Sequence, residues 1–144
     1  MRAIGSILLL GTVLFLGTAP AQAPTFENVG TMSQLMIHVI YPASDALFYI
    51  EREPPKTDVQ WNAIRMQALM VAESGNLLMM PGRARDDEWV KDAKLMVDAG
   101  AAAYKAALAK NMDAIVALSD QLTASCTTCH LKYRPNYRRS PLAQ

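Results

Sequence analysis

The chain has 144 residues, of which 14 are Lys or Arg and 13 are Asp or Glu, so its formal net charge is +1. A length of this order predicts a single domain, and the balanced charge argues against a nucleic-acid-binding protein. Strands are not expected either, because alternating apolar and polar runs are missing and residues that favour helices, such as Ala, Met, Leu and Lys, are frequent.

The N-terminal segment has the three-part pattern of a secretory signal peptide. One positive charge precedes an apolar run over about 4–16, and small residues follow. This run is shorter than the roughly 20 residues that a membrane-spanning helix needs. Cleavage after Ala21 avoids placing Pro24 next to the scissile bond, where proline fits a peptidase poorly. We therefore predict a signal peptide over 1–21, export to the periplasm and one mature domain over 22–144.

Two helices are predicted in the first half of the mature chain. The first spans about 29–51 with apolar residues at helical spacing, and Pro42 inside it predicts a kink at the preceding residue. A break that contains two adjacent prolines follows. The second helix spans about 59–79, and either Thr57 or Asp58 can cap its N-terminus.

Two further helices are predicted in the second half. The third opens with three acidic residues at 86–88, whose charge suits the positive end of the helix dipole. Its apolar face, which repeats every three or four residues and permits a close helix approach, comprises Trp89, Ala93, Met96, Gly100, Ala103 and Ala107. The last helix carries Asp113 in its first turn and ends near Tyr133. The predicted fold is all-α, an antiparallel four-helix bundle that can hold a cofactor between helices.

Both cysteines and one of the two histidines lie in the segment CTTCH, which contains Cys126, Cys129 and His130. On a helix, positions i, i+3 and i+4 share one face, so the two thiols and the imidazole converge. C-x-x-C-H is the pattern of covalent haem attachment, in which each thiol binds one vinyl group and the histidine ligates the iron. We therefore predict one covalent haem c on the last helix.

Other chemistries fit this segment less well. A thiol–disulfide oxidoreductase usually carries C-x-x-C at the start of a helix within a βαβ pattern, whereas this motif lies late in a helix. A structural zinc site needs four ligands, and His38 is the only other histidine. A disulfide between Cys126 and Cys129 would close a very short loop and add little stability. A haem-free dithiol redox protein stays as a distant alternative.

The segment CTTCHLKYR, on the last helix of a predicted four-helix bundle, resembles the C-terminal motif of class II cytochromes c. This family includes cytochrome c prime and its low-spin relatives. Its pattern C-x-x-C-H-x-x-Y-R matches Cys126, Cys129, His130, Tyr133 and Arg134. The resemblance covers about 26–137, and only the C-terminal motif is specific. It implies that the first helix passes over the far face of the haem. Low-spin members place a methionine there, and high-spin members place a bulky apolar residue and leave the iron five-coordinate.

By its place on the first helix, Met36 resembles the low-spin ligand, and Met32, one turn earlier, is the second candidate. Packing in the core is the alternative role for both methionines. His38 should point away from Met36, although a bis-histidine haem stays an alternative. Arg134 is expected to pair by charge with a haem propionate.

These expectations describe a periplasmic monohaem c-type cytochrome, an electron carrier rather than an enzyme, with iron held by His130 and Met36. The main alternative is a five-coordinate haem protein that binds nitric oxide or carbon monoxide. The expected partners are periplasmic or membrane redox proteins, and the resemblance also makes a homodimer an option. Four basic residues form either a solvated tail or a patch that meets an anionic partner: Lys132, Arg134, Arg138 and Arg139.

Overall fold

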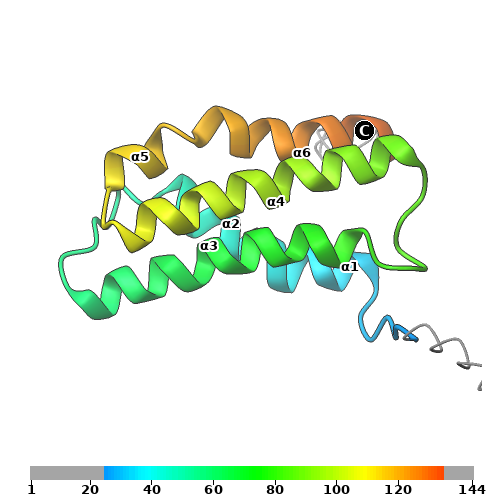
Figure 1. Cartoon of the computed structure of the whole chain (residues 1–144), viewed down its shortest axis with the longest axis horizontal. Helices are drawn as coiled ribbons and strands as arrows, with labels where there is room; N and C mark the ends of the chain where they lie inside the picture. The colour runs from blue at the N-terminus through cyan, green and yellow to red at the C-terminus, as the bar shows by residue number, and fades with distance from the viewer. Residues whose placement is uncertain (1–24, 135–144) are drawn as a thin grey trace, which may run out of the picture.

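A computed structural model describes residues 25–134, and these residues form helices and connecting segments without a β-strand (Figure 1). In chain order the elements are α1 (Met32–Leu35), the π-helical turn η1 (Met36–Ile40), α2 (Tyr41–Phe48), α3 (Asp58–Leu78), α4 (Asp87–Leu108), α5 (Met112–Val116) and α6 (Ser119–Tyr133). Because α1, η1 and α2 are continuous, and α5 leads into α6, four helices pack together. The predicted all-helical class is confirmed for the described residues.

The predicted signal peptide over 1–21 lies outside the described residues. Among the helices that the structure describes, none combines the length and the apolar character needed to cross a membrane.

The first helix is shorter than predicted and covers 32–48 instead of 29–51. Its start is fixed by a capping box. The Thr31 hydroxyl accepts a hydrogen bond from the Gln34 N–H, and the Gln34 side chain accepts one from the Thr31 N–H at 2.9 Å. This reciprocal pair satisfies donors that have no partner inside the helix. At the other end, Tyr49 leaves the helical conformation with φ −113° and ψ 21°.

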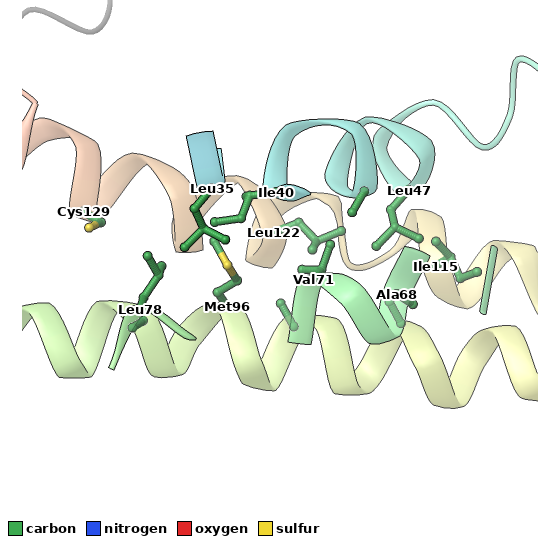
Figure 2. Close-up of a cluster of buried hydrophobic side chains, with 14 of the residues drawn as sticks. Leu35, Ile40, Leu47, Ala68, Val71, Leu78, Met96, Ile115, Leu122 and Cys129 are labelled. Atoms are coloured by element: carbon green, nitrogen blue, oxygen red, sulfur yellow. The ribbon is translucent and has the colours of Figure 1, made fainter. Parts of the chain in front are cut away.

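Just before Pro42, where the sequence predicted a kink, the chain makes a π-helical turn. The Tyr41 N–H donates to the Met36 carbonyl five residues back, so this turn holds one more residue than an α-helical turn. Proline lacks an N–H, and its ring would clash with the carbonyl four residues back in a regular helix. Leu35 and Ile40 are only 6% and 5% exposed and lie side by side (Figure 2). In an α-helix, side chains five residues apart would point in directions about 140° apart. The extra residue of the π-turn therefore allows both Leu35 and Ile40 to face the core.

Both ends of α3 and the start of α4 lie within one residue of their predicted positions. Thr57 caps α3 through a capping box with Gln60. Asp86 caps α4 by accepting a hydrogen bond from the Trp89 N–H at 2.8 Å. The Trp89 indole N–H then donates to the Leu78 carbonyl at 2.8 Å, which fastens the start of α4 to the end of α3.

α3 and α4 lie side by side at very short separation (Figure 1). A Cβ atom on Gly100 would come within 2.4 Å of the Ala72 backbone nitrogen and 2.7 Å of its Cα. A Cβ on Gly75 would come within 2.8 Å of the Ala93 carbonyl oxygen. The small-residue face predicted for α4 is buried, and it allows this approach.

The last predicted helix is divided into α5 and α6 at Ala117 and Leu118. The Leu118 N–H donates to the Ile115 carbonyl, three residues back, so the chain makes a tighter turn before α6 begins. The predicted end at Tyr133 is confirmed. The core runs along the inside of these helices, and Cys129 lies at one end of it (Figure 2).

Candidate functional site

The CTTCH segment occupies the second half of α6. Cys129 is 7% exposed and belongs to the core, whereas Cys126 and His130 are half-buried. Both cysteines are free. The hydroxyls of Thr127 and Thr128 donate to backbone carbonyls one turn back, each at 2.9 Å. These two side chains therefore turn back onto their own helix.

Three cavities lie between the first helix and α6, and both Met36 and His130 line all three. Their volumes are about 310, 550 and 30 Å³. The two larger volumes fall within the range of roughly 300–1,000 Å³ that is typical of ligand and cofactor sites. Cys129, Cys126 and Arg134 each line two of the cavities. The structure thus brings together five residues that the sequence predicted for the site. Met36 comes from the first helix, and Cys126, Cys129, His130 and Arg134 come from the C-terminal end of the described chain.

The two other candidates on the first helix differ from Met36. Met32 lines only the cavity of about 310 Å³. His38 is exposed and lines none of the three cavities. The side chain of His38 therefore points away from the site, as its spacing from Met36 predicted.

Burial sets the protonation of the thiols and the imidazole. It raises the pKa of Cys126, and it raises the pKa of Cys129 to about 11 with a smaller contribution from the Asp92 charge. Burial, followed by the positive charge of Arg134, lowers the pKa of His130. At neutral pH the thiols are protonated and the imidazole is neutral, and neutral imidazole is the form that ligates a metal.

The end of α6 is fastened to the start of α4. The Tyr133 hydroxyl donates to Asp86 Oδ1, and this hydrogen bond is the main cause of a lowered pKa of Asp86. Lys132 Nζ lies 2.5 Å from Glu88 Oε2 and 3.5 Å from Asp86 Oδ2. The Tyr133 ring meets the Trp89 ring edge-on, with centroids 4.9 Å apart. Tyr133 therefore holds the C-terminal end of the motif helix in place.

This arrangement also bears on the predicted basic cluster. Lys132 is paired with acidic residues of the α4 start, and Arg134 is exposed beside the two larger cavities. Arg138 and Arg139 lie outside the described residues.

Sequence reasoning missed two residues that line the cavities. The Arg85 guanidinium lies 4.8 Å from the centroid of the Trp89 ring and lines the cavity of about 310 Å³. It precedes α4 in a connecting segment, where no periodicity indicates its direction. Asp92 is 6% exposed and lines the smallest of the three cavities, that of about 30 Å³. Its spacing of three from Trp89 and four from Met96 places an acid on the predicted apolar face, and this signal could have identified it.

Comparisons of the chain with protein-family models, with curated proteins and with solved structures found no match. Within residues 25–134, no group of three or more His, Cys, Asp or Glu side chains is arranged to hold a metal ion. The chemistry of the side chains around the three cavities is therefore what indicates a function.

Proposed function

We propose that the chain is a periplasmic monohaem c-type cytochrome that carries single electrons. The haem would be attached through Cys126 and Cys129, with its iron ligated by His130. One observation carries this proposal: both thiols and the imidazole of the C-x-x-C-H motif line one set of adjoining cavities between two helices, and a methionine lines the same cavities from the other helix.

Each residue has a defined role in this proposal. The bound haem supplies a one-electron couple between ferric and ferrous iron. Each cysteine would hold the haem by addition of its S–H across one vinyl group, in which the S–H bond and the π bond are replaced by a C–S and a C–H bond and nothing is released. The neutral His130 ring donates a nitrogen to the iron. The apolar side chains around the cavities exclude water from the group.

We favour Met36 as the second iron ligand. Met36 lines all three cavities together with His130, whereas Met32 lines one. A thioether in this position raises the reduction potential and suits electron transfer. Arg134, which lines both larger cavities, would supply a positive charge for a haem propionate.

A dithiol oxidoreductase is a weaker interpretation of the same residues. Reactive C-x-x-C thiols have lowered pKa values and lie near a helix N-terminus. In this chain the pKa of both thiols is raised, and both cysteines lie in the second half of α6.

The proposed architecture is that of class II cytochromes c, an antiparallel bundle of four helices. Its support is the strand-free, helical structure of residues 25–134, the motif near the end of α6, and the lateral packing of α3 against α4 across the short connection 79–86 (Figure 1). In this setting the partners are periplasmic or membrane redox proteins.

The first test is covalent attachment. After expression in a host that exports and matures c-type cytochromes, the protein should carry one haem that survives denaturation and acid–acetone extraction. Replacing both Cys126 and Cys129 with alanine should abolish attachment. The double variant Thr127→Ala/Thr128→Ala changes the residues between the cysteines and should keep the haem. Haem that extracts freely from the wild type would refute the proposal.

An absorption spectrum then separates the two haem functions. Iron ligated by His130 and Met36 should be low-spin in the ferric state and should bind carbon monoxide poorly. A high-spin ferric spectrum with ready binding of carbon monoxide would instead support the five-coordinate, gas-binding alternative.

A further inference from the structure

Asp92 is a buried acidic residue that has no role among the haem ligands and attachment residues proposed above. It lies in the second turn of α4 and is 6% exposed. Its Oδ2 atom has no hydrogen-bond partner among the described residues. Burying a carboxylate oxygen without a hydrogen-bond partner is unfavourable, so such atoms are rare in folded proteins and call for an explanation.

The surroundings of Asp92 are those of the proposed cofactor. Asp92 lines the cavity of about 30 Å³ together with Cys126, Cys129 and His130. A cavity of this volume holds about one water molecule. The negative charge of Asp92 adds to the larger effect of burial in raising the pKa of Cys129.

Nothing that lines this cavity neutralises Asp92. None of its described lining residues is Lys or Arg, and most of them are apolar. Ser125 is the one hydroxyl residue among the described lining residues, and it donates its hydrogen bond to the Leu122 carbonyl at 2.7 Å. A negative charge in such a place is screened far less than a charge on the surface.

We propose that the Asp92 carboxylate lowers the reduction potential of the haem attached beside it, an inference that rests on the proposed function. Reduction transfers one electron from a partner to the iron, and the ferric group then loses one unit of positive charge. A nearby fixed negative charge favours the more positive, ferric form. Asp92 acts through space and contributes no bond to the iron.

Asp98 supplies a matched control on the same helix. It is exposed and pairs with Lys94 at 2.9 Å, so solvent and a counter-charge already screen it. Asp98→Asn removes the same unit of charge from α4 without changing the cavity. Its effect on the potential should be small.

The experiment is a spectroelectrochemical titration at pH 7 of the wild type and four variants, each first shown by mass spectrometry to carry covalent haem. Asp92→Asn and Asp92→Ser should each shift the ferric–ferrous equilibrium towards the ferrous form by about tenfold or more, which is about 59 mV upward for a one-electron couple. Asp92→Glu and Asp98→Asn should stay within about twofold of the wild type.

The outcomes separate this proposal from the proposed function. Neutral variants that stay within twofold of the wild type, or that shift the potential downward, overturn the role of Asp92 and leave the cytochrome function standing. A change in the axial-ligand spectrum of the Asp92→Asn and Asp92→Ser proteins also overturns it, because Asp92 then acts on the fold. A wild type without covalent haem refutes the proposed function itself, before any potential is measured.

Discussion

Met36 is the residue on which the type of haem function depends. If its thioether ligates the iron, the ferric protein shows the weak near-infrared band of methionine–iron ligation. Met36→Ala should remove this band, lower the reduction potential and open the iron to carbon monoxide. The potential falls because a thioether is a soft ligand that favours ferrous iron. Near-infrared absorption and a carbon monoxide titration measure the effects.

Met32→Ala is the control for this prediction. Met32 is partly buried and lines one cavity, so its loss should leave the band in place and weaken only packing. If Met32→Ala alone removes the band, the ligand is one turn closer to the N-terminus. A low-spin wild type without the methionine band would contradict both assignments and direct attention to His38, despite its exposed side chain.

At the level of helices, the contact between α3 and α4 depends on Gly100. Gly100→Ala should destabilise the protein, because the new Cβ would press on backbone atoms of Ala72, which cannot turn aside as a side chain can. Overpacking of this kind costs about 1–3 kcal/mol. The gain in helix propensity from Gly to Ala is only about 1 kcal/mol. Urea denaturation should therefore show a lower free energy of unfolding.

Ala102→Gly is the corresponding control on a half-buried position of α4. It should lose about 1 kcal/mol through propensity alone. A Gly100→Ala variant that is more stable than the wild type would mean that α3 and α4 do not approach each other closely at Gly100.

The helices differ in how far the sequence determines them. The starts of α3 and α4 are predicted to within one residue because their N-caps, Thr57 and Asp86, are residues with a strong preference for that position. The division between α5 and α6 is not predicted, since Ala117 and Leu118 carry no signal that breaks a helix. The π-turn is only half predicted. Pro42 indicates an irregularity, but the five-residue spacing of Leu35 and Ile40 becomes informative only once both are known to be buried.

Over the molecule as a whole, the residues of the candidate site differ in how readily the sequence identifies them. Cys126, Cys129 and His130 follow from local spacing on one helix. Met36 required a family resemblance, because no pattern in one sequence tells which methionine faces a motif on another helix. Arg85 required the structure, since the direction of a connecting segment before α4 is set by tertiary packing.

The proposed haem should also contribute to the stability of the whole fold. The variant with both Cys126 and Cys129 replaced by alanine leaves cavities of about 310 and 550 Å³ between the helices without their covalent occupant. A group that binds only the folded state stabilises it. The thermal midpoint should fall by ~10 °C or more relative to the wild type, whereas Thr127→Ala/Thr128→Ala should change it little. Equal midpoints would mean that the haem does not pack between the helices.

The π-turn at Met36–Ile40 changes how this helix would respond to a change in its length. Such a turn is equivalent to one residue inserted into an α-helix. Loss of a single codon within it would therefore keep the side chains on both flanks facing the core, while Pro42 would still interrupt the regular hydrogen bonding of the helix. Loss of a codon in α2 would rotate one flank by about 100° relative to the other. The turn that begins with the proposed iron ligand, Met36, is thus the part of the first helix in which a deletion preserves the phase of both flanks.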